Sequence, residues 1–189
     1  DVSLARWEFS PPSGTNTLTA HLEAYSPVPP ARPPVILSEI QYHPSDSADS
    51  GDWFELHNPG TAPVDLTGWI VRDDTDSNVS VVSSGVIPAG GYAVFCQDSL
   101  RFQRTFPLGP KPLGEFGFGL GNGGDTLRIH AADGRLVLKL AYDDSAPWPV
   151  EADGRGYTLQ LRSVQAYSDQ PGAWRVSTRI GGSPGVANP

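Results

Sequence analysis

The residues best placed for chemistry form one short run in which oxygen-bearing side chains alternate, at Asp74, Asp76 and Asn78. Oxygen ligands at alternate positions open the calcium loop of an EF-hand, so this run could bind Ca²⁺ or another hard cation. The rest of that loop is absent, because Val79 stands where glycine is needed and Gly85 where a bidentate glutamate is needed. Acidic turn residues that hydrogen-bond to nearby backbone would explain the same run. A calcium site and a structural turn therefore both remain open.

Three other groups of residues carry oxygen or nitrogen atoms of the kind that bind metal ions. They are the loop of Asp46, Asp49 and Asp52, the pair Asp143 and Asp144, and Glu55 with His57 on one strand, which Glu39 or Asp65 could approach in the fold. Each group also has a structural explanation, because polar residues fill loops and the solvent-facing side of a sheet in an acidic protein. The sequence leaves both interpretations open.

Trp148 is the candidate for an aromatic contact with a ligand. It lies in a loop between Pro147 and Pro149, which favours exposure of its ring. With Trp53 and Trp174 it could form a flat platform for a sugar or a proline-rich peptide, since large rings give contact area at low entropic cost. The same rings could instead pack inside the domain.

Signatures of catalysis are missing from the sequence. It contains no Gly-x-Ser-x-Gly elbow, no His-Glu-x-x-His helix and no pair of cysteine or histidine ligands. The glycine-rich run 119–124 matches the dinucleotide fingerprint formally, but it leads into a predicted strand instead of the helix that would hold pyrophosphate. We therefore predict that the protein is not an enzyme, with no catalytic or cofactor-binding residue. It should require no cofactor, Ca²⁺ being the only one considered.

The composition argues for a soluble β protein and against two classes of partner. With 21 glycines and 19 prolines, the chain is rich in tight turns between ordered segments. Its formal charge of -8 would repel the phosphates that nucleic-acid-binding proteins neutralise. No apolar stretch approaches the roughly 20 residues that cross a bilayer, so membrane insertion is not expected. The single cysteine, Cys96, excludes an internal disulfide and is expected to be buried.

Short runs of alternating apolar and polar residues, without any alternation of strands and helices, predict an antiparallel β-sandwich. The expected strands cover residues 35–42, 53–58, 68–71, 80–83, 91–96, 156–161 and 174–177, and a hairpin over 125–142 turns at Asp133-Gly134.

Two of these elements carry specific predictions about burial. In the strand 53–58, Phe54 and Leu56 should face the core, and Trp53, Glu55 and His57 should share the opposite, wetter face. A short helix is expected within 99–107, with Leu100, Phe102 and Phe106 on one face and Pro107 at its end.

Three segments are expected along the chain. Residues 1–26 hold two candidate strands that could form a hairpin, as the tail of a preceding domain. Residues 27–34 are a proline-rich linker, and residues 35–189 are the β-sandwich. A lone hairpin is marginal in water, so residues 1–26 should pack on the main domain or on another chain.

Six blocks of sequence, taken in order, suggest a family. They are Ile36-Leu37-Ser38-Glu39-Ile40, Trp53-Phe54-Glu55-Leu56-His57-Asn58-Pro59-Gly60, Val64-Asp65-Leu66-Thr67-Gly68-Trp69, Ile87-Pro88-Ala89-Gly90-Gly91-Tyr92, Gly123-Gly124-Asp125-Thr126-Leu127 and Gly182-Ser183-Pro184-Gly185. Over about residues 35–188 the chain resembles the lamin tail domain, and in particular its bacterial, secreted branch. The resemblance implies an immunoglobulin-like antiparallel β-sandwich, with an N-terminal β-hairpin appended here, and no catalytic residues to carry over.

The resemblance also implies a setting. Bacterial members of the family look like accessory modules of large exported proteins, so we expect an extracellular or cell-surface location within a longer bacterial protein. Vertebrate members engage DNA and nuclear-envelope partners, but this acidic chain lacks the basic patch that the DNA role needs. A protein or cell-surface partner is therefore expected, and no nucleic acid.

Three functions follow from these observations. The first is a non-catalytic interaction or scaffolding module of a larger secreted or cell-surface protein, with self-association through the N-terminal strands as one contact mode. The alternative is a calcium- or carbohydrate-binding accessory module, using the acidic run or Trp148. The third is a hydrolase, against which the absence of any nucleophile or metal signature argues.

Overall fold

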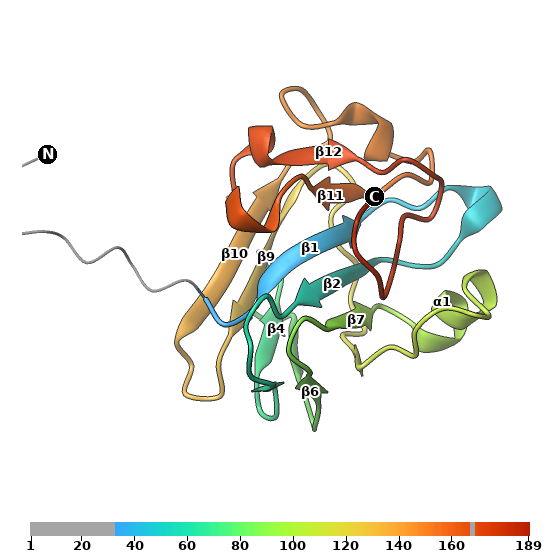
Figure 1. Cartoon of the computed structure of the whole chain (residues 1–189). Coiled ribbons are helices and arrows are strands. Elements are labelled where there is room, and N and C mark those ends of the chain that lie inside the picture. Colours follow the sequence, from blue (N-terminus) through green and yellow to red (C-terminus); the bar gives the residue numbers. More distant parts are fainter. Residues whose placement is uncertain (1–32, 167–168) are drawn as a thin grey trace, which may run out of the picture. The chain divides into compact units, whose positions relative to one another are not determined.

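The computed structural model describes residues 33–166 and 169–189 of the chain (Figure 1). The described part corresponds to the β domain expected from residue 35 onward. The hairpin predicted within residues 1–26 and nearly all of the predicted linker 27–34 lie outside the described residues, so both stay predictions.

The larger of two main sheets contains six strands. They are β1 (Ile36–Gln41), β2 (Trp53–His57), β7 (Tyr92–Cys96), β8 (Gly114–Glu115), β11 (Leu159–Leu161) and β12 (Trp174–Val176). Their order is β12-β11-β1-β2-β7-β8, and neighbours are antiparallel except β7 and β8, which are parallel. The strands predicted at 35–42, 53–58 and 91–96 are thus confirmed at the centre of this sheet.

The smaller sheet contains four antiparallel strands. They are β4 (Ile70–Arg72), β5 (Val79–Val81), β9 (Asp125–His130) and β10 (Leu136–Tyr142), in the order β10-β9-β4-β5. The pairing of β9 with β10 confirms the hairpin predicted over 125–142. A further pair, β3 (Val64–Asp65) with β6 (Val86–Ile87), stands apart. The two-residue strands were not predicted, because two residues are too few to show alternation.

The helices are short. They are α1 (Ser99–Thr105) and the 3-10 turns η1 (Asp46–Ala48), η2 (Val150–Ala152), η3 (Val164–Ala166) and η4 (Pro171–Ala173). The carboxylate of Asp98 caps α1 by accepting the N–H groups of Leu100 and Arg101, at 2.8 and 2.9 Å. Among the described residues, no helix combines the length and the apolar character needed to cross a lipid bilayer.

The core forms where the inner faces of the sheets meet and confirms the predicted sandwich. In the larger sheet, the ring of Phe54 stacks on the ring of Phe95, with centroids 5.2 Å apart. The ring of Phe116, the residue after β8, stacks on Phe54 with a centroid distance of 5.7 Å. The smaller sheet contributes Val71, Leu127, Ile129, Leu138 and Leu140, all buried in the same cluster. Each such side chain stabilises the fold by about 1.5 to 3 kcal/mol through burial.

The strand β2 is buried on both faces, so the prediction that Trp53, Glu55 and His57 occupy a wet face is wrong. Segments distant in sequence cover that face. The ring of Trp53 meets Phe102 of α1 edge to face at 5.9 Å, and His57 stacks on Tyr92 at 4.3 Å. Phe54 and Leu56 are buried as predicted.

Two leucines also differ from prediction. Leu100 is 67% exposed, whereas Phe102 is buried, because positions two apart lie on different sides of a helix. The two-residue period of the predicted hairpin strand also places Leu136 on the same face as Leu138 and Leu140, yet Leu136 is 47% exposed. A register shift between Leu136 and Leu138 turns Leu136 to the outer face of the sheet.

Candidate functional site

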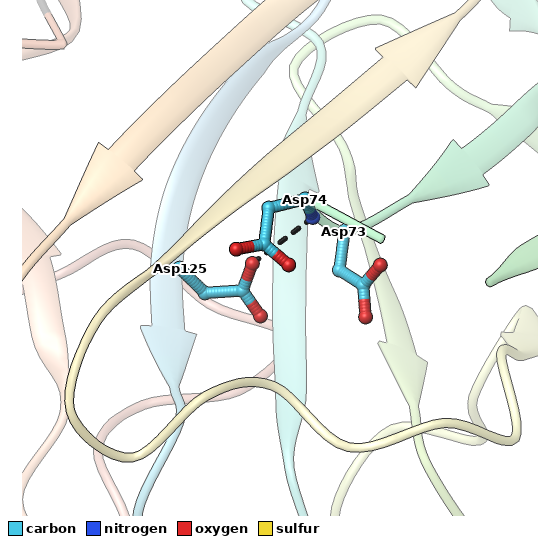
Figure 2. A group of neighbouring side chains, drawn as sticks. All are labelled: Asp73, Asp74 and Asp125. Carbon is cyan, nitrogen blue, oxygen red and sulfur yellow. Dashed lines mark hydrogen bonds between the residues drawn. The ribbon is translucent and has the colours of Figure 1, made fainter. Parts of the chain in front are cut away.

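The acidic run identified in the sequence follows β4, beside the start of β9. There Asp73, Asp74 and Asp125 each offer a carboxylate oxygen, and the three oxygens lie within 4.8 Å of one another (Figure 2). The backbone N–H of Asp74 donates to Asp125 Oδ1 at 3.0 Å. Within residues 33–166 and 169–189, no other three carboxylate, histidine or cysteine side chains are close enough to share a metal ion.

Of the three predicted ligands, only Asp74 belongs to this group. Asp76 forms an ion pair with Arg128 at 2.9 Å, and Asn78 Nδ2 donates to Asp73 Oδ2 at 2.6 Å. The structure therefore does not bring Asp74, Asp76 and Asn78 together as one ligand set. A tight turn, closed by the N–H of Asn78 on the Thr75 carbonyl at 2.9 Å, points alternate side chains in different directions.

Local hydrogen bonds already use much of the acceptor capacity of this group. Asp73 is buried and accepts the Thr75 N–H at 2.8 Å. Asp125 accepts the N–H of Gly121 at 2.8 Å and of Thr126 at 2.6 Å. A carboxylate has about four lone-pair sites, so positions remain that could coordinate a hard cation. The turn-stabilising role is visible in these bonds, and Ca²⁺ binding stays a prediction.

Two buried glutamates, Glu39 on β1 and Glu55 on β2, occupy paired positions on neighbouring strands. Glu39 accepts hydrogen bonds from the Thr158 hydroxyl, from Gln160 Nε2 at 3.0 Å and from the Ser183 hydroxyl at 3.1 Å. Burial removes water from its carboxyl group and raises the pKa of Glu39, and these hydrogen bonds oppose the rise only in part.

Glu55 ties the C-terminal segment, residues 182–188, to the larger sheet. Its Oε2 accepts the Gly185 N–H at 2.5 Å, and its Oε1 accepts the Ser38 hydroxyl at 2.6 Å. Asn188 Nδ2 donates to the Ser38 carbonyl at 2.8 Å. Burial raises the pKa of Glu55 to about 8 against these hydrogen bonds, and the charge of neighbouring Glu39 adds to the rise. These contacts hold the segment in place.

Of the partners expected for a metal site at Glu55 and His57, Glu39 does lie opposite Glu55, but these side chains do not form a group of metal ligands with His57 or Asp65. The His57 ring bonds to the Gly91 carbonyl at 3.0 Å, and Asp65 is exposed and accepts the Thr67 N–H at 2.8 Å. The hydroxyl and N–H of Thr67 hold the pKa of Asp65 below its usual value. The pair Asp143 and Asp144 likewise lies in a turn, where Asp143 accepts the N–H of Ser145.

The loop between β1 and β2 carries Asp46, Asp49 and Asp52, which line a polar cavity of about 240 Å³ together with Arg101 of α1. Asp49 pairs with Arg101, and Asp52 is buried, with its Oδ2 accepting the Leu120 N–H at 2.8 Å. The three carboxylates do not come within metal-ligand distance of one another. The loop therefore forms a polar recess instead of a three-carboxylate metal site.

Trp148 packs inside the domain, which is one of the two arrangements that the sequence left open, and the exposure favoured by its place between two prolines is not found, because only 7% of its surface is accessible. Its ring packs beside Trp174, with centroids 6.4 Å apart, inside the main hydrophobic cluster. Trp53 is also fully buried. None of these three rings offers a sugar a flat exposed surface.

The outer face of the smaller sheet presents two rows of side chains that cross all four strands. Strand register aligns the first row as Val81, Ile70, His130 and Leu136. It aligns the second row as Val79, Arg72, Arg128 and Lys139. Burial, followed by the charges of Arg72 and Arg128, lowers the pKa of His130, so this ring is neutral near pH 7. One row is therefore uncharged and the other is basic.

The fold and these sites define an immunoglobulin-like β-sandwich module with open polar and apolar surfaces. The Lamin Tail Domain family model matches residues 28–144, which is more than half of the 189-residue chain. The chain therefore belongs to the lamin tail domain family, as its sequence blocks suggested. A comparison with curated proteins found no match. The larger sheet extends past the matched residues, because β11 pairs with β1.

Sequence reasoning missed two participants in these sites. Asp125 was predicted to open a strand but was not placed with the acidic run, although it meets Asp74 across 51 residues of chain. Asp52 was placed in an acidic loop, although it is buried beneath the 119–122 turn. One signal was available for Asp52. The next residue, Trp53, indicated that a strand begins at this point, next to Asp52.

Proposed function

We propose that the chain is a non-catalytic interaction module of a larger secreted or cell-surface bacterial protein. Membership of the lamin tail domain family supports an interaction role. The observation that carries the proposal is the open outer face of the smaller sheet. Three apolar side chains remain accessible there, with exposed fractions of 41% for Val79, 59% for Val81 and 47% for Leu136. A contiguous apolar surface rimmed by polar groups is typical of a protein-binding site.

The partner that fits this face is a polypeptide segment with apolar and acidic side chains at alternate positions. Apolar side chains would cover the row that begins at Val81, and carboxylates would face Arg72 and Lys139 in the basic row. β5 is an edge strand of its sheet, so a partner strand could also extend the sheet there. Nucleic acid fits less well, because the whole chain carries a charge of -8.

Binding of a capped peptide of alternating valine and glutamate, followed by amide chemical shifts of the full chain, tests the proposal. We expect shift changes in β4 and β5, and binding at least tenfold weaker in the double variant Val79→Ser, Val81→Ser. Both valines are exposed, so the substitutions should change the free energy of unfolding by only about 0.5 kcal/mol each. Val186→Ser is the matched control, because Val186 is 54% exposed and belongs to the C-terminal segment held on the larger sheet.

The outcomes separate the possibilities. The proposal would be overturned if the double variant bound the peptide as tightly as the wild type does. It would also be overturned if the peptide changed no amide chemical shift in the two rows. Tighter binding of a DNA duplex than of the peptide at the same residues would replace it with a nucleic-acid role. A peptide with lysine in place of glutamate should bind more weakly, because it places like charges beside the basic row.

Residues 1–26 could supply a partner strand themselves, which keeps self-association within the proposal. Light scattering should then give the full chain a higher molar mass per particle than a chain lacking residues 1–26. Equal states of association in the two chains would remove this contact mode and leave the binding face untouched.

Calcium binding is the second candidate, and the grouping of Asp73, Asp74 and Asp125 is the observation that favours it. Hard cations prefer carboxylate oxygens, and two of these residues lie on a loop that could adjust around an ion. Carbohydrate binding through Trp148 is no longer favoured, since that ring is buried.

A further inference from the structure

The polar recess beside α1 is a second surface with its own chemistry, independent of the outer face of the smaller sheet. Its cavity of about 240 Å³ lies between the β1–β2 loop, the start of α1 and the turn at Asn122. Figure 1 shows that loop, with η1, at the same end of the domain as α1. The volume is below the roughly 300 Å³ at which small-molecule pockets begin, so it suits one side-chain head group.

Asp52 is the central residue of the recess. It is 8% exposed, and only its Oδ2 accepts a hydrogen bond, from the Leu120 N–H at 2.8 Å. The described residues provide no hydrogen bond or ion pair to its Oδ1. The Oδ1 atom is not among the solvent-inaccessible atoms that lack a partner, so it is open to the recess and can accept a hydrogen bond from a donor that enters there. The backbone at Asp52 is held in place, because its carbonyl accepts the Gln97 N–H at 2.8 Å.

The charges around Asp52 leave the recess negative. Asp46 and Asp49 line it as well, and Arg101 is the one arginine or lysine among the lining residues described. Arg101 is already paired with Asp49. Behind the lining residue His43, the carboxylate of Asp153 bonds to the ring at 2.5 Å and adds further negative charge.

A metal ion is a poor match for this arrangement. Asp46, Asp49 and Asp52 do not form a group whose ligand atoms lie within 4.8 Å of one another in the described chain. An organic cation suits separated acceptors better, because ammonium and guanidinium groups each carry several N–H donors.

We infer that this recess binds the basic side chain, lysine or arginine, of a partner polypeptide. The ammonium or guanidinium group would donate to the free oxygen of Asp52, and Asp46 at the rim would add attraction. The rest of the partner stays outside, because the cavity has room for the head group alone.

The test uses capped tripeptides Gly-Arg-Gly and Gly-Lys-Gly as probes, titrated into the isotope-labelled full chain. We expect the amide signals of Gly51, Gln97 and Asn122 to shift with the basic peptides and to stay in place with Gly-Gln-Gly. Asp52→Asn keeps an oxygen for the Leu120 N–H but removes the charge, so it should weaken binding at least tenfold. Asp133→Asn, in the β9–β10 turn, is the matched control and should bind as the wild type does.

A second variant covers the case in which Asp52→Asn does not fold. Asp46→Asn changes an accessible rim residue and should weaken binding about threefold.

Three results would overturn the inference. They are unchanged peptide affinity in the folded charge variants, binding of Gly-Gln-Gly as tight as that of the basic peptides, and no change in amide shifts up to millimolar peptide. Free arginine binding more tightly than Gly-Arg-Gly would assign the recess to a small molecule instead, and Ca²⁺ shifting the same signals would assign it to a metal. These readouts do not involve the two rows of the smaller sheet, so either proposal can fail alone.

Discussion

Replacing Glu55 by glutamine should remove much of the pH dependence of stability between about pH 6 and 8. Burial raises the pKa of Glu55 to about 8 in the folded protein, whereas in the unfolded chain its ordinary value is 4.5. The folded state therefore holds a proton that the unfolded state has released. The free energy of unfolding must then fall as the pH rises. This contribution is complete below about pH 4.5 and disappears as the pH passes through about 8.

The magnitude follows from the shift. A difference of one bound proton changes the free energy of unfolding by about 1.4 kcal/mol per pH unit. With a folded-state pKa of about 8, the loss from pH 6 to 8 is about 2 kcal/mol. Glutamine stands in for the protonated acid, because its carbonyl can accept the Gly185 N–H and its amide can donate to the Ser38 hydroxyl.

Urea unfolding followed by tryptophan fluorescence at about pH 6, 7 and 8 measures the effect. The wild type should lose about 2 kcal/mol more than Glu55→Gln over this range. Burial also raises the pKa of Glu39, which faces Glu55 on the neighbouring strand, so the difference between the two proteins reports Glu55 together with its coupling to Glu39. Glu151→Gln, at an exposed position, should follow the wild type. If the free energy of unfolding falls with pH equally in the wild type and in Glu55→Gln, Glu55 is already ionised at pH 6, which would refute the reasoning.

Two further predictions concern Trp148 and calcium. Trp148→Ala should lower the free energy of unfolding by about 3 to 5 kcal/mol, because it empties a buried site beside Trp174. A thermal melt checks this against the exposed control Val150→Ala, and equal melting temperatures would contradict the packing role. If Ca²⁺ binds at Asp73, Asp74 and Asp125, millimolar Ca²⁺ should raise the melting temperature by several degrees over EDTA, and Asp74→Asn should reduce that rise. Identical melts with Ca²⁺ and EDTA would remove the calcium candidate.

Local chemistry predicted much of the fold. The hairpin of β9 and β10 was predictable because Asp133-Gly134 sits between two alternating runs, and Gly134 adopts the positive φ of 83° that such a turn needs. The inward positions Phe54 and Leu56 were predictable from the two-residue period of a strand. The order of sequence blocks predicted the family.

Long-range contacts account for the parts that the sequence did not predict. The second face of β2 is covered by α1 and by the C-terminal segment, and the Glu55 contact with Gly185 spans 130 residues. Alternation in one strand carries no information about such covers. For the same reason Asp125 could not be assigned to the acidic group, since only the pairing of β4 with β9 brings it to Asp74.

The attachment of residues 182–188 to the larger sheet has a mechanical consequence. A pulling force applied at Asn188 would load the bonds from Gly185 to Glu55 and from Asn188 to the Ser38 carbonyl. These bonds reach the central strands β1 and β2 directly, while the bond from Arg175 to the Pro189 carbonyl carries part of the load to the edge strand β12. Because Glu55 holds one of them, the force needed to peel the segment away should depend on the acidity of the surroundings.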